Sequence, residues 1–461
     1  IARIAKNAGL ERTSIHKALK DERMLPYTAL RQLGQYLQLT LPQMRELNQY
    51  YEMLLRGEDL YYIQKTICGL LADLSQMHFS CQGPVLIPER AAEAPASPGI
   101  VYGRPQVEAA IQAVLQWETE VEGAELELYL PPACRVPDCL LPLWRAGREF
   151  TVRQLVAFRS EQSSGDTRQE NLRRLQHLLP LSLVSGGRYF AYYYFEQNGE
   201  AVSIDPLTYF IITPRQLIRM DANLSVAQFQ SAPELLHLYR NRLGQILAEC
   251  QLLNSYSNDP ELVLEAYMQG TDLDSYYVMM TQPCLGHYYT RERIAGQFWP
   301  DVPGREKLVE LSDRRFERLR KLENNYFTIF TEEGLRQFAA DGVEVDLPPE
   351  LVRPIEVPLR RQLLEEFRQD IQEERIRACM ADPEHLPIPP YLTITCDPRF
   401  GVHIYAVQGF IGGAYACNLH IEEGGIGQSF CSFIRSLPGS KFVHPKEKLL
   451  AVLDELIGQL A

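Results

Sequence analysis

Apolar residues recur at helical spacing through the first part of the chain. Ile15, Ala18 and Leu19 fall at i, i+3 and i+4, which predicts a short helix with one apolar face. Thr40 and Gln43 form a T-x-x-Q capping box, and this pair predicts the start of a longer helix whose apolar stripe runs over residues 41–55.

A further helix is expected at about 58–79, with a broad apolar face that includes Leu60, Ile67, Leu74 and Met77. A face of that width is unstable in water, so it must pack on something. Two interpretations are open at this point. The helix either docks on the C-terminal part of its own chain or forms the seam of a homodimer.

From about residue 105, stretches with period-two alternation lie between stretches of helical period, which favours α/β layers. The succession of strands, turn and helices at 188–252 returns at 391–460, and this predicts two related lobes. Residues 253–303 give no clear pattern. Strands are expected at about 125–130, 150–158, 188–195, 207–212, 217–221, 326–330, 391–395, 402–407 and 414–420, and helices at about 106–120, 140–146, 167–179, 232–252, 306–322, 332–340, 359–380, 428–436 and 445–460.

The first twenty residues read as two short helices joined by a sharp turn. Gly9 suits the turn because glycine tolerates a left-handed backbone, and Leu10 is expected to be buried beside it. Thr13 or Ser14 is expected to cap the second helix. The outer face of that helix is polar and basic, which a major groove accepts.

The residues A-K-x-A-G-L-x-x-T-x-I at 5–15, then Pro26 and a helix with Leu30, Leu33 and Leu37, closely resemble the lambda-repressor-like (XRE) helix-turn-helix domain. The resemblance covers about 1–55. The family has a further helix before the one near Arg3, which this sequence does not contain. The resemblance implies a duplex DNA operator and a prokaryotic-type transcriptional regulator.

The polar face of the second helix predicts which residues meet the DNA. Base contacts discriminate between sequences, whereas phosphate contacts only position the protein. The residues predicted to contact base edges are Thr13, Ser14, His16 and Lys17. Those predicted to contact phosphates are Lys6, Arg12, Lys20 and Arg23. One short recognition helix offers few contacts, so a homodimer on a two-fold operator is expected.

The expected fold class is therefore an all-α helix-turn-helix region followed by an α/β (mixed α+β) C-terminal region. The division is 1–57 for the DNA-binding domain, 58–80 for a connecting or dimerisation helix, 81–104 for a linker rich in Pro, Ala and Gly, 105–260 for lobe 1 and 261–461 for lobe 2.

Charge is distributed unevenly along the 461 residues. The net charge of −13 would argue against a nucleic-acid partner, but residues 1–40 hold seven Lys or Arg against three acids. That balance of +4 leaves −17 for the remainder, so DNA contact is expected only at the N-terminal end. No apolar run approaches the ~20 residues of a membrane helix, and a cytoplasmic protein without a membrane partner is expected.

Candidate chemistry is sparse. The ten cysteines include no C-x-x-C pair and read as buried thiols, although Cys134 and Cys139 lie close enough in sequence to pair. No metal site, cofactor motif or complete catalytic motif is present. His444-Pro-Lys446 resembles the H-x-K of the phospholipase D fold, but Ala451 stands where that family needs an aspartate.

Tyrosines in runs suggest a pocket for a small-molecule or peptide effector, for which Tyr192, Tyr194, Tyr277 and Tyr289 are the candidates; packing between sheet and helix explains them equally well. The function expected is a DNA-binding transcriptional regulator whose C-terminal region senses an effector or partner. An enzyme or toxin with an autoregulatory helix-turn-helix region and a protein-interaction scaffold are the alternatives.

Overall fold

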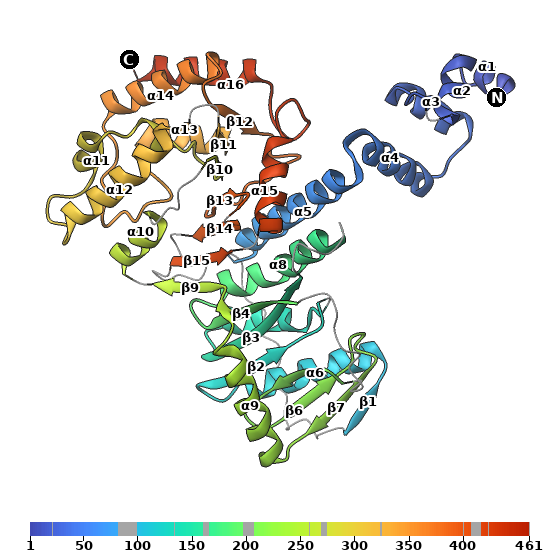
Figure 1. Cartoon of the computed structure of the whole chain (residues 1–461), viewed down its shortest axis with the longest axis vertical. Helices are drawn as coiled ribbons and strands as arrows, with labels where there is room; N and C mark the ends of the chain where they lie inside the picture. The colour runs from blue at the N-terminus through green and yellow to red at the C-terminus, as the bar shows by residue number, and fades with distance from the viewer. Residues whose placement is uncertain are drawn as a thin grey trace. The chain divides into compact units, whose positions relative to one another are not determined.

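The structure, a computed structural model, separates into two compact units, the head (Ile1–Tyr62) and the body (Ile63–Ala461) (Figure 1). Most of the predicted linker, 82–98, lies outside the described residues. No helix in the part that the structure describes is long and apolar enough to cross a membrane. The described residues are 1–20, 22–81, 99–132, 134–159, 166–196, 207–257, 259–268, 274–322, 325–399, 401–406, 416–422 and 424–460.

The head contains α1 (Ala2–Asn7), α2 (Arg12–Leu19), α3 (Tyr27–Tyr36) and α4 (Leu41–Arg56). Gly9 has a φ of 68°, and Leu10 donates its backbone N–H to the Ala5 carbonyl at 2.9 Å, so the turn between α1 and α2 lies where the glycine predicts it. Ala5, Ile15 and Leu30 are buried together with Gly34. The predicted capping box of α4 is present.

Two details of the predicted α2 are wrong. The helix begins at Arg12 with Glu11 as its N-cap, and neither Thr13 nor Ser14 caps it; the Thr13 hydroxyl instead donates to the Glu11 carboxylate at 3.5 Å. Leu19, which was expected on the apolar face, is 67% exposed. The buried face of α2 therefore centres on Ile15, because an eight-residue helix presents only about two turns to its neighbours.

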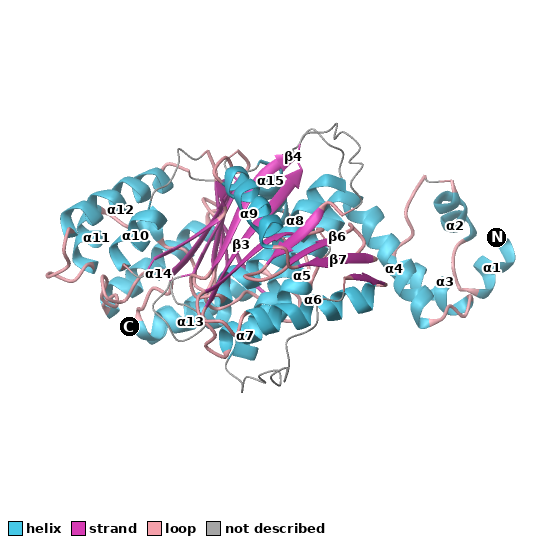
Figure 2. Cartoon of the chain, turned by 90° about the horizontal axis from the view of Figure 1, so that it is seen from below, coloured by secondary structure: helices cyan, strands magenta, loops and turns pink. Residues whose placement is uncertain are grey.

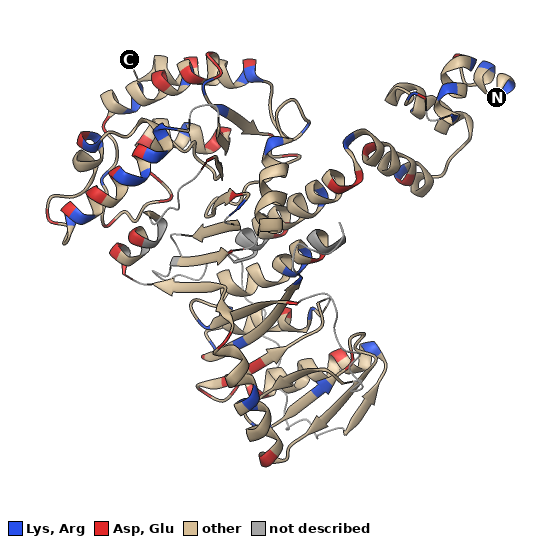
Figure 3. Ribbon diagram, in the orientation of Figure 1, with Lys and Arg blue, Asp and Glu red and all other residues tan. Residues whose placement is uncertain are grey.

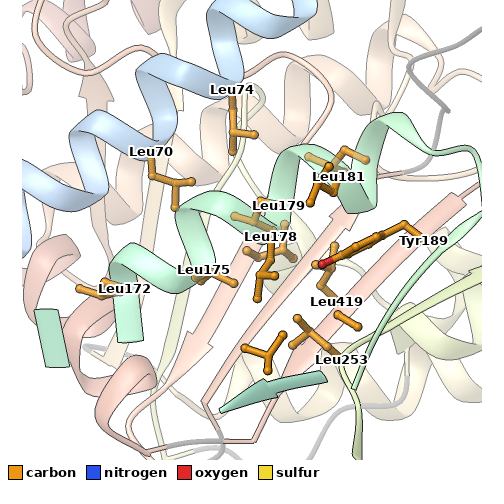
Figure 4. Close-up of a cluster of buried hydrophobic side chains, with 14 of the residues drawn as sticks. Leu70, Leu74, Leu172, Leu175, Leu178, Leu179, Leu181, Tyr189, Leu253 and Leu419 are labelled. Atoms are coloured by element: carbon orange, nitrogen blue, oxygen red, sulfur yellow. The ribbon is translucent and has the colours of Figure 1, made fainter. Parts of the chain in front are cut away.

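Helix α5 (Glu58–Cys81) carries the broad apolar face predicted at 58–79. From Ile63 onward it belongs to the body, where Ile67, Leu70, Leu71 and Leu74 are 0–1% exposed in the main core. Figure 4 shows Leu70 and Leu74 beside the leucines of α8 (Asp166–Val184). Docking on the same chain is thus what the structure shows, and this face is unavailable as a dimer seam unless the body opens.

The first sheet of the body has the strand order β1-β7-β6-β5-β2-β3-β4-β8. Strands β2, β3 and β4 are parallel, and the other pairings are antiparallel. Their bounds are β1 Ile100–Tyr102, β2 Ala124–Tyr129, β3 Phe150–Arg159, β4 Tyr189–Glu196, β5 Tyr209–Ile212, β6 Leu217–Met220, β7 Val226–Gln230 and β8 Gln251–Leu252.

The second sheet has the order β12-β11-β10-β13-β14-β15-β9. Strands β10, β11 and β12 are parallel, and β13 pairs antiparallel with β10. Their bounds are β9 Asn254–Ser257, β10 Tyr276–Met279, β11 Tyr326–Thr331, β12 Arg377–Ala381, β13 Thr393–Asp397, β14 Gly401–Ala406 and β15 Ala416–Ile421.

Both sheets repeat one topology. Three sequential parallel strands form one side, and the next strand of the chain returns beside the first of them, antiparallel, to start a run of hairpins. The sequence predicted a repeat between 188–252 and 391–460, but the equivalence is displaced by one strand, because β5 and not β4 corresponds to β13. Strand β9, however, pairs with β15 in the second sheet, although the predicted boundary at 260 assigned it to lobe 1.

Helices cover the sheets on both faces (Figure 2). On the first sheet, α9 packs over Leu155 and Ile212, while α6, α7 and α8 share the main core on the opposite face. On the second, α15 faces the main core, and α10–α14 with α16 enclose a separate core. Their bounds are α6 Arg104–Glu118, α7 Leu141–Arg145, α9 Pro233–Leu247, α10 Pro260–Met268, α11 Arg291–Gln297, α12 Arg305–Arg320, α13 Glu332–Asp341, α14 Val357–Gln372, α15 Gly424–Arg435 and α16 Lys446–Gln459.

The two sheets are joined through the segment 251–257. Leu253 donates its N–H to the Ala191 carbonyl at 2.8 Å, and its own carbonyl accepts from the N–H of His420 at 3.0 Å. The buried Asn254 side chain bonds the Ala191 N–H at 2.9 Å and the Tyr189 carbonyl at 2.8 Å. These buried polar groups are thus satisfied where the two sheets meet. Buried apolar residues of both lobes also form one continuous core.

The long helix expected at 359–380 is wrong in its second half. Helix α14 ends at Gln372, and β12 begins at Arg377, where it pairs parallel with β11. Glu374, with a φ of 60°, lies in the connecting turn. The local helical pattern is overridden because Met380 and Ala381 are buried by strand pairing in the sheet.

Candidate functional site

The first candidate surface lies on the head, around α2. Thr13, His16 and Lys17 are exposed, Ser14 is half-buried, and Ile15 faces the head's core. The four residues predicted to hold phosphates, Lys6, Arg12, Lys20 and Arg23, are all exposed. The structure therefore leaves every predicted DNA-contacting side chain accessible to solvent to some extent. Figure 3 shows basic positions on α1 and α2.

The cations of this surface differ from many in the body because they form no ion pair with a described residue. In the body, Arg336 pairs with both Glu332 and Glu455, and Arg153 pairs with Glu125 and Glu127. By contrast, the five cations predicted to contact DNA at this surface make no ion pair and no side-chain hydrogen bond with another described residue: Lys6, Arg12, Lys17, Lys20 and Arg23. The same holds for Arg3, Arg31 and Arg45 of the head. An anionic partner such as a phosphate backbone would meet no competing carboxylate on them.

The four tyrosines predicted to form an effector pocket are not brought together. Tyr192 and Tyr194 are half-buried on β4 beneath α9. Tyr277 is buried on β10, stacked on Phe327 at 4.5 Å between ring centroids. Tyr289 is buried against the second sheet and donates to the Glu344 carboxylate at 2.6 Å. These four residues therefore do not line one common pocket, since they belong to different sheets and cores, and effector binding by any one of them stays a prediction.

Tyr289 lines an enclosed space of about 20 Å³, which has room for about one water molecule. Glu344, at the wall of this space, also accepts from Gln297. Desolvation, with a smaller contribution from the charge of Asp346, raises the pKa of Glu344 to about 8. This carboxyl group is held as a hydrogen-bonded structural element rather than in a site that a substrate could enter.

A much larger cavity, of about 590 Å³, lies at the carboxyl ends of the parallel strands β2, β3 and β4. Ligands in open α/β sheets bind at this edge, and cavities of roughly 300–1,000 Å³ are typical of small-molecule sites. Two tyrosines that the sequence did not single out, Tyr129 and Tyr209, line it with their rings 5.1 Å apart.

The polar part of this cavity comes from the end of β3 and from α8. Glu170 lies between two arginines, at 3.1 Å from Arg159 Nε and 2.7 Å from Arg174 Nη2. The Asn171 side chain bonds both the N–H and the carbonyl of Arg159, at 2.9 and 2.8 Å, and so fixes the end of β3 to α8. Burial is the main cause of the lowered pKa of His177, and the charge of Arg135 adds to it.

Arg174 is the unusual member of this group. Its side chain is only 7% exposed, and its Nε and Nη1 atoms have no hydrogen-bond partner among the described residues. A signal for it exists in the sequence, since Arg174 falls at helical spacing with Leu178 and Leu181 on the apolar stripe of α8. The cavity itself depends on segments far apart in the chain and was not predictable from the sequence.

The H-x-K residues line a second cavity, of about 450 Å³, beside β12. Lys446 Nζ lies 3.4 Å from the Glu374 carboxylate, and His444 Nε2 lies 3.1 Å from Lys448 Nζ. Each residue thus has a partner outside the motif, and Ala451 supplies no carboxylate. This arrangement offers no acid, base or nucleophile organised around a common reacting atom.

Residues that could hold a metal ion are found at one exposed turn. Ligand atoms of Asp382, Glu384 and His385 lie within 4.8 Å of one another. Their proximity follows from the turn itself, in which Asp382 accepts from the Glu384 N–H at 3.1 Å and contacts the His385 ring at 3.3 Å. Cys134, which lines the large cavity, has its pKa raised to about 11 by burial and is an unreactive thiol.

No family model matches the chain, and no curated protein matches it. Among solved structures, a phosphatidylserine synthase from Haemophilus influenzae Rd KW20 is 9% identical, with a TM-score of 0.24 over 78% of this chain and 92% of that chain. A polyphosphate kinase from Porphyromonas gingivalis is 9% identical, with a TM-score of 0.21 over 78% of this chain and 55% of that chain. Likenesses this loose carry no inference about activity.

Proposed function

We propose that the protein is a sequence-specific DNA-binding transcriptional regulator, in which the head binds duplex DNA and the body senses an effector. The observation that carries the proposal is the group of exposed cations around α2 that form no ion pair with a described residue. It is supported by the resemblance of residues 1–55 to the XRE domain.

In this proposal α2 is the recognition helix. Ser14, His16 and Lys17, with Thr13, meet base edges in the major groove, where side chains can distinguish the four base pairs. Lys6, Arg12, Lys20 and Arg23 hold phosphates and set the register. The balance of −17 outside residues 1–40 repels DNA, which restricts binding to the head.

The proposal includes a homodimer on a two-fold operator, with half-sites about 34–36 Å apart or a multiple of that spacing. The seam is not the apolar face of α5, because Ile67 and Leu74 are already buried inside the body. Light scattering of the full chain, free and with a selected operator, measures the stoichiometry. A single protomer on a two-fold operator would contradict this part of the proposal.

The test is a set of binding titrations with the full chain on an operator selected from random duplexes, and on random duplex as reference. Lys17→Ala should weaken operator binding by about 1–3 kcal/mol and reduce specificity, because a base contact is lost. Arg23→Ala should weaken binding to all sequences alike and lower the salt slope by about one unit. Arg45→Ala, an exposed cation on α4 outside the proposed surface, is the matched control.

Equal losses on operator and random DNA for Lys17→Ala would show that α2 does not read bases. Failure of the full chain to select any duplex, together with tight binding to a protein partner, would support the scaffold alternative instead.

A further inference from the structure

We infer that the cavity at the carboxyl ends of β2, β3 and β4 binds a small organic acid, a molecule that carries a carboxylate or phosphate group on an aromatic or otherwise apolar frame. The inference rests on the cavity's volume of about 590 Å³ and on Arg174, a residue of the cavity wall that has two buried donors without a partner among the described residues. That this ligand is the effector rests, in addition, on the proposed function.

The energetics of Arg174 require an acceptor. A guanidinium has five N–H donors, and a buried donor without a partner destabilises the protein, more so when the group is charged. Glu170 satisfies Nη2 of Arg174 but leaves Nε and Nη1 without a partner among the described residues. An oxyanion from a ligand supplies the missing acceptors and the compensating charge together.

The charges around Arg174 favour an anion over a neutral acceptor. Glu170 is shared between the buried Arg174 and the half-exposed Arg159, so it compensates the charge of Arg174 only in part. Glu196 also lines the cavity, but it lies opposite Arg159 in the register of β3 and β4, where Arg159 is 48% exposed. The charges of Glu196 and Arg159 therefore both fall at the solvated end, where screening is strong, and Arg174 is the buried cation of the cavity.

The other residues that line the cavity indicate the chemistry of the rest of the ligand. Tyr129 and Tyr209 offer ring surface, and Leu130, Pro131 and Leu178 are apolar. Aromatic surface of this kind accommodates a flat apolar group, and an acidic group at one end fixes its orientation. Burial keeps the pKa of His177 low, so this ring is neutral at pH 7 and does not replace Arg174 as the cation.

A physical route leads from this cavity to the helix that enters the head. Arg174 and Leu178 are on α8, and α8 packs against α5 through leucines of both helices (Figure 4). The Gln176 side chain also donates to Asp73 of α5 at 2.6 Å. Helix α5 begins at Glu58, inside the head, so a shift of α8 acts on an element common to both units.

The experiment measures binding by calorimetry with the full chain in the absence of DNA. The probes are 4-hydroxybenzoate, phenyl phosphate, inorganic phosphate and the neutral 4-hydroxybenzamide, each at millimolar concentration. The first two should bind with saturation and the amide at least tenfold more weakly. Comparison of 4-hydroxybenzoate with phenyl phosphate distinguishes a carboxylate site from a phosphate site, and inorganic phosphate tests whether the apolar frame matters.

Three variants locate the binding. Arg174→Gln should weaken the binding of both aromatic anions at least tenfold, whereas Arg173→Gln, the exposed neighbour on α8, should change it less than twofold. Ala222→Trp, at an exposed position on the cavity wall, should block entry without removing a polar contact. This last variant keeps the test valid if Arg174→Gln fails to fold, which circular dichroism would reveal.

Equal binding of the amide and the benzoate would overturn the anionic class. Saturable binding that survives both Arg174→Gln and Ala222→Trp would overturn the site, and so would the absence of binding by all three anions. A probe that binds at the cavity but leaves the operator titration unchanged would refute only its role as effector. The failures of the site and of the proposed function are thereby distinguishable.

Discussion

Replacing Leu74 with alanine tests whether α5 is part of the body's core or an exposed surface that binds a second protomer. Leu74 is 0% exposed, and so is its neighbour Leu71 one turn earlier. The backbone is fixed there as well, because the Tyr391 hydroxyl donates to the Leu74 carbonyl at 2.8 Å. Truncation of a leucine in such a site leaves a cavity that the surroundings fill only partly, and the free energy of unfolding should fall by about 2–5 kcal/mol.

The assay is denaturant unfolding of the full chain followed by tryptophan fluorescence. All three tryptophans lie in the body, and Trp144 is 1% exposed in the same core as Leu74, so the signal reports the unit under test. Leu54→Ala is the matched control, because Leu54 is a 74% exposed leucine on α4 of the head. Its change should stay within about 0.5 kcal/mol.

The dimer-seam interpretation makes the opposite prediction. If α5 were a seam, Ile67→Asp with Leu74→Asp would give a folded, soluble monomer. If α5 is docked, the same pair places two carboxylates in the core and the body loses its cooperative transition. A stable monomer with normal tryptophan fluorescence, together with a Leu74→Ala midpoint equal to that of Leu54→Ala, would refute the docked arrangement.

Two further predictions concern the second lobe. Gly334→Ala should destabilise the body by roughly 1–3 kcal/mol, because the new Cβ would lie 2.1 Å from the Thr281 carbonyl oxygen. Gly244→Ala in α9 should instead stabilise the body by up to about 1 kcal/mol, because the space around Gly244 is open. Thermal unfolding of the two variants measures both effects. Glu344→Gln should remove a pH dependence of the free energy of unfolding. The folded pKa of Glu344 is about 8 against an ordinary 4.5, so the folded protein keeps a proton that the unfolded chain loses above pH 4.5. The stabilising contribution of this proton is therefore full below pH 4.5 and disappears as the pH rises to 8. Denaturation midpoints that fall equally in the wild type and Glu344→Gln between pH 5 and 8 would contradict the assignment to Glu344.

Local pattern predicted much of the element content, because each helix or strand must turn an apolar face toward a core. The strand at 150–158 and the helix at 445–460 are examples, since β3 and α16 occupy nearly the same residues. The pattern failed where pairing with a distant strand decides the conformation, as at β12. It also failed for the tyrosines, because alternation indicates the two faces of a strand but not which sheet or core each face meets.

The duplicated topology of the body gives a reason to place the ligand in one lobe rather than both. The same edge of the second sheet, at the carboxyl ends of β10 and β11, is closed by direct packing. Helix α13 follows β11 at once, and Gly334 in its first turn approaches the Thr281 backbone so closely that no side chain fits between them. Gln282 fills the adjoining space through hydrogen bonds to Val343 and Val345, and the space left there is about 20 Å³.

In the first lobe the same edge is open and contains a buried cation. In the second lobe this edge is packed closely around Gly334, and the cavity of about 450 Å³ in that lobe lies beside β12 instead. The two lobes therefore differ at the carboxyl ends of their first two parallel strands. A solvent-open space beside a buried cation whose donors lack a partner among the described residues is suited to a ligand that supplies acceptors. The asymmetry between the lobes therefore argues, independently of the charges, that the cavity beside Arg174 is completed by a ligand.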